Sequence, residues 1–273
     1  MKEIFQIEFR GWRRGYFLNS SSLPLQIGEW VLVNAEKGED MGRVIKKALV
    51  RDGPFHPQEI LRKATPEDMK RIEENRGKEE EARRICQSKI EERRLPMKLV
   101  DVEYQFDGNK LIFYFISEER IDFRALVRDL ASVYKTRIEM KQIGVRDQAK
   151  RMGGYGSCGR SLCCATFLED FEPITTQLAK EQHLTLIPSK ISGVCGRLMC
   201  CLLFERKLYE EELKRYPPIG AKLRSERGIG VVEKVDIFSE MVTVAHADGV
   251  VEELALSELQ KGTKKGRSFF KRI

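Results

Sequence analysis

Two copies of one cysteine-rich phrase constrain this chain more than any other feature of its sequence. The copies begin at Gly156 and Gly193 and end at Phe167 and Phe204, and both follow the pattern G-x-C-G-R-x-[LM]-C-C-x-x-F at an offset of 37 residues. Chance does not align so many residue types twice, so we expect the function to depend on these thiols. The six cysteines of the phrases are Cys158, Cys163, Cys164, Cys195, Cys200 and Cys201.

These cysteines are expected to be reduced. Charged residues interrupt the apolar runs of the N-terminus, which predicts no signal peptide, and no stretch reaches the roughly 18 apolar residues that a membrane-spanning helix needs. We therefore expect a cytoplasmic protein, in which clustered cysteines are more often metal ligands or redox groups than disulfides. A chain of 273 residues can also bury a core without disulfides.

The basic charge of the chain is concentrated at its C-terminus. The formal net charge is +7, but residues 261–273 carry six lysines and arginines and no acid, which leaves +1 for the other 260 residues. This basic tail can contact phosphates, and it can equally be a solvated chain end.

A second candidate for RNA contact lies near the N-terminus, where Arg10, Arg13 and Arg14 alternate with aromatic residues. Such a mixture suits base stacking with phosphate contact, but the same aromatic residues also suit the interior of a small barrel. The aromatic residues are Phe9, Trp12, Tyr16 and Phe17.

Hydrophobic patterning predicts an α+β fold. Alternating apolar residues and turn glycines favour a small N-terminal β-barrel or sheet, a ββαβ core and a C-terminal SH3-like β-barrel. In the core we expect strands at 99–106 and 111–116, a helix at 123–134 and a strand at 137–143. The predicted segments are an N-terminal β segment (1–60), a charged helix (61–95), an α+β core with both cysteine phrases (96–216), the SH3-like barrel (217–260) and the basic tail (261–273).

The long charged helix has clear start signals. Thr65 is its expected N-cap, Pro66 its first residue, and Glu67 and Asp68 lie in its first turn. Nine basic and nine acidic residues between positions 66 and 94 indicate a solvated face and not a binding stripe. Cys86, which lies alone in this helix, is interpreted as structural or incidental.

The two phrases suit an anionic metal centre. Thiolate is the form that binds metal, the glycine after the first cysteine lets amide hydrogens face sulfur, and Arg160 and Arg197 can offset the charge of several thiolates. Adjacent cysteines point in different directions, so Cys163 and Cys164 are not expected to bind one metal together. Six thiolates exceed by two what one tetrahedral zinc or one four-cysteine iron–sulfur cluster needs. Iron–sulfur, zinc, and redox or structural thiols all stay open at this point.

The sequence predicts no catalytic constellation. A cysteine nucleophile needs a base, and the histidines are His56, His183 and His246. His183 alone lies between the phrases; it is interpreted as a core or surface residue, with a nitrogen ligand to a metal as the alternative. No phosphate-binding G-x-x-x-x-G-K-[ST] motif occurs in the sequence. We therefore predict that the protein is not an enzyme.

The cysteine phrases, together with the residues that precede each of them, resemble the RicT family, also called YaaT, of bacterial PSP-domain proteins. The resemblance covers nearly the whole chain, with residues 28–33 and 42–44 similar to the family's first β segment and 228–232 to its last. It implies a non-enzymatic regulatory subunit that assembles with two small helical partners, RicA (YmcA) and RicF (YlbF). The complex would carry 4Fe-4S clusters and help the membrane-associated endoribonuclease RNase Y to process messenger RNA.

The resemblance further implies effects on sporulation, competence and biofilm formation, and it matches all six phrase cysteines to family cysteines. A cluster shared with the partners would take up the two surplus thiols. The alternative is a zinc-stabilised adaptor that docks proteins or RNA. We expect a cluster to fix the loops between Gly153 and Cys201, which would make partner binding sensitive to iron supply or oxidation.

Overall fold

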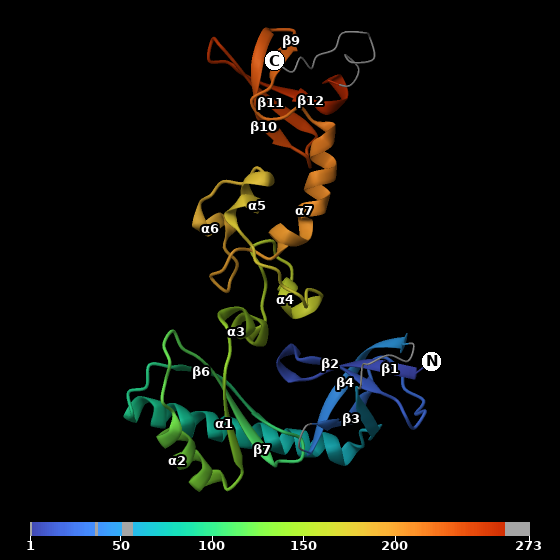
Figure 1. Ribbon diagram of the computed structural model, residues 1–273, viewed down its shortest axis with the longest axis vertical. Helices are drawn as coiled ribbons and strands as arrows, with labels where there is room; N and C mark the ends of the chain where they lie inside the picture. The colour runs from blue at the N-terminus through green and yellow to red at the C-terminus, as the bar shows by residue number, and fades with distance from the viewer. Residues whose placement is uncertain (1, 36–37, 51–56, 260–273) are drawn as a thin grey trace. The chain divides into compact units, whose positions relative to one another are not determined.

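A computed structural model describes residues 2–35, 38–50 and 57–259 (Figure 1). The chain forms two compact units, Met1–Ala165 and Thr166–Ile273. The mixed α+β fold that the sequence predicts is confirmed, whereas its division into five segments stays a prediction. His56 and the basic tail lie outside the described residues. No helix in the described ranges combines the length and the apolar character that crossing a membrane requires.

The first unit begins with a closed five-stranded barrel, so the predicted N-terminal barrel is confirmed. The strand order is β1-β2-β5-β3-β4; β2 and β5 run parallel and the other neighbours antiparallel. Alternation along the strands places Phe5, Ile7 and Val31 in the interior. The elements are β1 (Lys2–Glu8), a 3-10 turn η1 (Arg10–Trp12), β2 (Arg14–Leu18), β3 (Trp30–Ala35), β4 (Gly38–Val50) and β5 (Gln58–Lys63).

Helix α1 (Pro66–Glu92) begins with the predicted cap. The Thr65 hydroxyl accepts a hydrogen bond from the Asp68 amide, and the Asp68 carboxylate accepts one from the Thr65 amide at 2.7 Å. These reciprocal bonds satisfy two backbone donors that a helix start otherwise leaves open.

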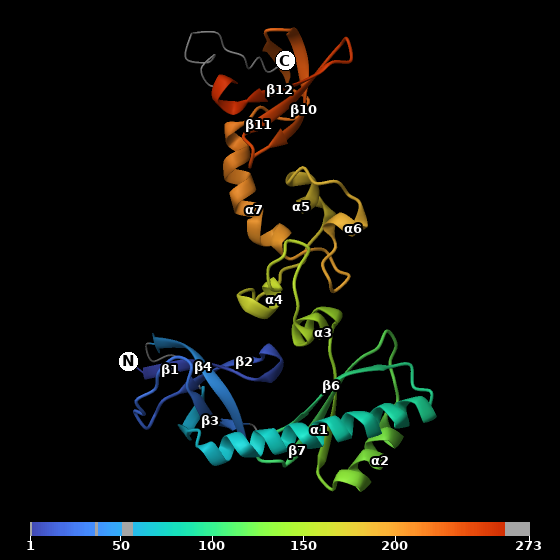
Figure 2. The ribbon, with the colours of Figure 1, turned by 180° about the vertical axis from the view of Figure 1, so that it is seen from behind.

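The same helix contributes to two hydrophobic cores, because it runs along the second sheet and reaches the barrel (Figure 2). Ile72 packs against a cluster that contains Leu32 and Met41 of the barrel. About three to five turns further along the helix, Ala82 and Ile90 are buried against the second sheet.

The second sheet has the order β6-β7-β8. Strands β6 and β7 form an antiparallel hairpin, and a helix carries the chain to β8, which is parallel to β7. This is the ββαβ order expected from the sequence. The elements are β6 (Lys98–Tyr104), β7 (Lys110–Ile116), α2 (Arg124–Tyr134) and β8 (Arg137–Gln142), followed by α3 (Val145–Met152) and the short α4 (Cys163–Thr166).

The second unit consists of short helices followed by a sheet. The sheet is antiparallel with the order β12-β11-β10-β9, so the predicted closure of this segment into an SH3-like barrel is not confirmed. Within the described residues, β9 and β12 are its two edges. The elements are α5 (Thr176–Glu181), α6 (Pro188–Ile191), α7 (Cys201–Glu212), the 3-10 turn η2 (Leu213–Arg215), β9 (Lys222–Ser225), β10 (Gly228–Asp236), β11 (Met241–His246) and β12 (Val251–Ala255).

Candidate cysteine centre

The two cysteine phrases fold into the same backbone loop. In the first phrase, the Gly159 amide donates to the Gly156 carbonyl at 3.0 Å, and the Gly156 amide donates to the Arg160 carbonyl at 2.8 Å. A β-bridge between Tyr155 and Ser161 closes the loop. The second phrase repeats these contacts 37 residues on: Gly196 to Gly193 at 2.9 Å, Gly193 to Arg197 at 2.8 Å, and the bridge Ser192–Leu198.

A glycine is required at one position of each loop. Gly159 and Gly196 both have φ of 75°, a left-handed conformation that costs other residues roughly 1–2 kcal/mol. A Cβ atom at either position would meet no heavy atom within 4 Å, so backbone conformation and not space selects glycine. This glycine follows the first cysteine of each phrase, and it therefore sets the turn on which that thiol lies.

The cysteines occupy equivalent places in the two phrases but differ in exposure. Cys158 is exposed on its turn, whereas Cys195, its counterpart, is half-buried. Cys163 is the first residue of α4 and is half-buried, while the adjacent Cys164 is buried. Cys200 is the N-cap of α7 and Cys201 its first residue, and both are half-buried.

Arg151 on α3 attaches the start of the first phrase to the second sheet. Its guanidinium donates to Asp101 at 2.7 Å and to Glu103 at 3.2 Å, and it lies 3.4 Å from the centroid of the Tyr114 ring. The Arg151 side chain is 6% exposed. Because Gly153 follows two residues later, this contact fixes where the first phrase leaves the sheet.

The second phrase rests on a small core in the second unit. Leu178 and Ala179 of α5 pack with Ile191 and Leu202, which lie on either side of the loop. In addition, the side-chain amide of Gln182 donates to the Leu202 carbonyl. The loop is therefore fixed at both of its ends.

The closing phenylalanines of the two phrases meet. The ring centroids of Phe167 and Phe204 lie 4.9 Å apart with an interplanar angle of 60°. This distance is within the range of favourable aromatic pairs.

The donor chemistry of the two phrases suits a thiolate-bound group. Within the described ranges, no three side chains of histidine, cysteine, aspartate or glutamate are grouped so that they could hold a metal ion.

The two described histidines, His183 and His246, lie at positions where they contribute to the local structure. His183, with φ of 55°, follows α5, where the Leu184 amide donates to the Ala179 carbonyl and ends the helix. His246 on β11 pairs with Glu252 on β12 at 3.0 Å. Neither belongs to a three-residue ligand group in the part of the chain that the structure describes.

Cys86 is buried in the core between α1 and the second sheet, with Leu126 and Leu130 of α2 in the same cluster. Burial raises the pKa of its thiol to about 12, because an apolar environment disfavours the thiolate. Its predicted structural role agrees with this position.

The N-terminal arginines bind carboxylates of this chain. Phe9 and Phe17 are buried in the barrel with ring centroids 5.6 Å apart, as the barrel-interior interpretation expects. The guanidinium groups that were candidates for phosphate contact instead form internal ion pairs. These pairs are Arg10 with Glu79 and Asp101, Arg13 with Asp40 and Glu103, and Arg14 with Glu8.

Sequence reasoning missed this buried charge network. Burial raises the pKa of Glu103, but Arg13 and Arg151 outweigh it and hold this pKa below its ordinary value. For Glu79, burial prevails over Arg10 and the pKa is raised. The available signal was the pair Asp101 and Glu103, two acids at the period of two on the otherwise apolar strand β6.

Comparison with known proteins gives matches over most of the chain. The family described as "PSP1 C-terminal conserved region" matches residues 58–143, and "PSP1-like protein, third domain" matches residues 173–216. The chain is 42% identical over 247 residues to "Stage 0 sporulation protein YaaT" of Bacillus subtilis, covering 89% of this chain and 90% of that protein.

Two fungal proteins match over shorter regions. An uncharacterised protein of Schizosaccharomyces pombe is 36% identical over half of this chain and 23% of its own length. Protein PSP1 of Saccharomyces cerevisiae is 51% identical over 45 residues, which is 16% of this chain and 5% of that protein. No solved structure is matched.

Proposed function

This chain belongs to the YaaT (RicT) family, and from that premise we propose that it is a non-enzymatic regulatory subunit of a complex with RicA-like and RicF-like partners. In this proposal the complex carries 4Fe-4S clusters in the cytoplasm and promotes processing of messenger RNA by RNase Y, with effects on sporulation, competence and biofilm formation. The Bacillus subtilis relative is named a stage 0 sporulation protein, which supports a role in sporulation.

The observation that carries the proposal is the duplicated loop. Two segments with the same turn, the same left-handed glycine and the same bridge place cysteines at equivalent positions. The repeated backbone geometry gives the cysteines of the two phrases equivalent positions, and thiolates are the ligands of iron–sulfur clusters. We propose that all six phrase cysteines act as ligands to clusters in the complex.

We propose that the partner subunits take part in holding the cluster. The described residues bring no three candidate ligands together, and in this proposal the partners complete the coordination. We propose that the loops, attached through Arg151 on one side and through the Leu202 core on the other, present their thiols to partner subunits. A bound cluster would supply a redox-sensitive link between the subunits.

Anaerobic purification of the chain alone and with its partners tests the proposal. Iron, sulfide and zinc are quantified and the visible absorption spectrum is recorded. Iron and sulfide in near-equal amounts, with a broad band near roughly 400 nm, would support the cluster. Stoichiometric zinc in a colourless protein would favour the alternative, a zinc-stabilised adaptor that docks proteins or RNA, and would leave redox coupling without a basis.

A further inference from the structure

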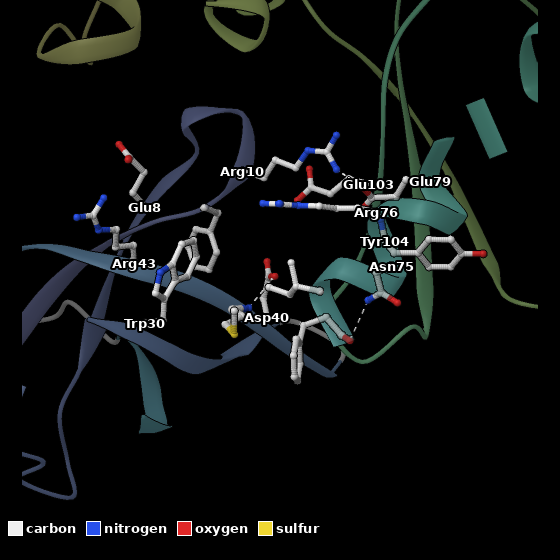
Figure 3. A pocket seen from close by; sticks show the side chains of 14 residues that line it. Glu8, Arg10, Trp30, Asp40, Arg43, Asn75, Arg76, Glu79, Glu103 and Tyr104 are labelled. Atoms are coloured by element: carbon white, nitrogen blue, oxygen red, sulfur yellow. Dashed lines mark hydrogen bonds and ion pairs between the residues drawn. The ribbon is translucent and has the colours of Figure 1, made fainter. Parts of the chain in front are cut away.

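A cavity of about 260 Å³ opens in the first unit beside the barrel and α1 (Figure 3). Trp30, at the start of β3, lines it and is 38% exposed. Asn75 and Arg76 of α1 also line it, and no residue of either cysteine phrase does. Apolar side chains complete the lining: Phe9, Met41, Ile72 and Phe106.

The carboxylates of this cavity are neutralised by arginines. Each of the four acids that line it has an ion-pair partner within the first unit. The pairs are Glu8 with Arg14 at 2.9 Å, Asp40 with Arg13 at 3.0 Å, Glu79 with Arg10, and Glu103 with Arg13 at 2.8 Å and Arg151 at 3.2 Å.

Two further guanidinium groups line the cavity without such a partner. Among the described residues, no carboxylate lies within 4.0 Å of the guanidinium nitrogens of Arg43 or Arg76. Within the described part of the chain these two charges have no ion-pair partner, and such charges favour an anionic ligand.

The aromatic ring and one of these cations are held together by the sheet. Trp30 and Arg43 are directly opposite each other in the antiparallel β3–β4 ladder, so their side chains leave the same face of the barrel wall. The Arg43 Nε atom donates to the Gly28 carbonyl at 3.2 Å, which orients its guanidinium. In Figure 3, Arg76 extends from α1 toward the side of the cavity that holds Trp30.

We propose that this cavity binds a nucleoside phosphate, with the base stacked on Trp30 and the phosphate between Arg43 and Arg76. An exposed aromatic ring stacks with any base, and guanidinium groups bind phosphate through charge-assisted hydrogen bonds. The Asn75 amide nitrogen donates to the Phe106 carbonyl at 3.3 Å, which leaves its side-chain oxygen to accept from the base edge. At about 260 Å³ the cavity lies close to the lower limit of about 300 Å³ for small-molecule pockets, so it suits a ligand no larger than a single nucleotide.

The same chemistry is offered by a free mononucleotide and by the phosphorylated end of an RNA strand. Neither source requires the cysteine phrases, so this inference is independent of the proposed regulatory function. A comparison of the affinities for a free mononucleotide and for a phosphorylated RNA end distinguishes the two sources.

The chain contains two tryptophans, Trp12 and Trp30. In the full-length Trp12→Phe variant, Trp30 is therefore the single fluorescent indole. We expect saturable quenching of its emission by AMP or by a 5′-phosphorylated oligoribonucleotide, and at least about tenfold weaker binding of adenosine, which lacks the phosphate. Tighter binding of AMP identifies the free nucleotide as the ligand, and tighter binding of the oligonucleotide identifies an RNA end.

In the Trp12→Phe protein, Arg76→Gln and Arg43→Gln should each lower the affinity for the tighter-binding probe by at least about tenfold. Both arginines are exposed, so the fold should be retained, which thermal unfolding checks. Lys78→Gln removes the same charge from an exposed position of the same helix outside the cavity and should leave affinity unchanged. Absence of saturable quenching by both probes, or equal losses in Arg76→Gln and Lys78→Gln, would overturn the proposal.

Discussion

The rings of Phe167 and Phe204 contact each other at a centroid distance of 4.9 Å, although these residues close two phrases that lie 37 positions apart in the sequence. Both side chains remain more than half exposed, at 54% and 58%. Burial of the two side chains therefore does not explain why they lie close together. The contact between the rings is itself an interaction that joins the ends of the two phrases.

Substitution of the two phenylalanines should show this coupling. We expect the double variant Phe167→Ala/Phe204→Ala to lose less stability than the sum of the single variants, with a coupling energy of about 0.5–1.5 kcal/mol. Urea unfolding of the four proteins measures it. Phe204→Ala combined with Ile229→Ala, an exposed residue on β10, is the matched control and should be additive. Additivity of the phenylalanine pair itself would contradict the coupling.

The loop glycines should resist substitution for a conformational reason. Gly159→Ala and Gly196→Ala should each cost roughly 1–2 kcal/mol, because alanine disfavours a φ of 75°. Gly77→Ala is the control: Gly77 lies within α1 with no heavy atom near its Cβ position, so alanine there should stabilise by about 0.5–1 kcal/mol. Thermal unfolding compares the three variants, and a neutral result at both loop positions would be evidence against this explanation.

Iron retention should depend on the phrase cysteines and not on the core cysteine. We expect Cys158→Ser or Cys195→Ser to remove most of the iron and to weaken co-purification with the partners, whereas Cys86→Ala should retain both. Iron analysis and co-purification under anaerobic conditions measure the two effects. If the complex forms normally after complete loss of iron, the cluster does not hold the subunits together.

The thiols should differ in reactivity. Because burial raises the pKa of Cys86 to about 12, almost none of it is thiolate at pH 8, and its access is blocked as well. Iodoacetamide should therefore modify the exposed Cys158 in the folded apo-protein and leave Cys86 unmodified until the protein unfolds. Peptide mass spectrometry after timed labelling distinguishes the sites, and early alkylation of Cys86 would show that its core opens readily.

Loss of Arg151 should destabilise the first unit and make it more sensitive to acid. Arg151→Met leaves Asp101 and Glu103 with fewer cations and should cost about 3 kcal/mol. The native pKa of Glu103 is lowered, so its contribution to stability is present above its unfolded pKa and is lost as pH falls through its folded pKa. The variant raises that folded pKa, so the acid-unfolding midpoint should move to higher pH.

Circular dichroism during acid titration measures this shift. Lys150→Met, which removes a cation from the neighbouring position of α3, should leave the midpoint near that of the unsubstituted protein. Equal shifts in the two variants would show that overall charge and not the Arg151 contacts controls acid stability.

Local signals account for the parts of the fold that the sequence predicted. Thr65 and Asp68 identify the start of α1 because a capping box involves residues three positions apart. The apolar runs of β1 and β3 likewise predict strands, and the structure buries consecutive residues of both, so that neither strand has a single buried face. Closure of the C-terminal segment was not predictable in the same way, because turn glycines fix hairpins but not whether the edge strands β9 and β12 pair.

The candidate site was predictable in composition and not in geometry. The repeated pattern identified all six phrase cysteines, but the burial of Cys164 and the contact of Phe167 with Phe204 depend on packing between distant segments. The ion pairs of Arg10 and Arg13 were also hidden, because their carboxylate partners lie 27 to 91 positions away. Such pairs leave no periodic signal in a single sequence.

Helix α1 has a consequence for how the first unit opens. Its early turns pack on the barrel through Ile72 and its later turns on the second sheet through Ala82 and Ile90. Opening either core therefore exposes part of the same helix. Amide hydrogens along α1 should consequently exchange with solvent as one cooperative group, and the barrel and second sheet should share a single slow exchange rate.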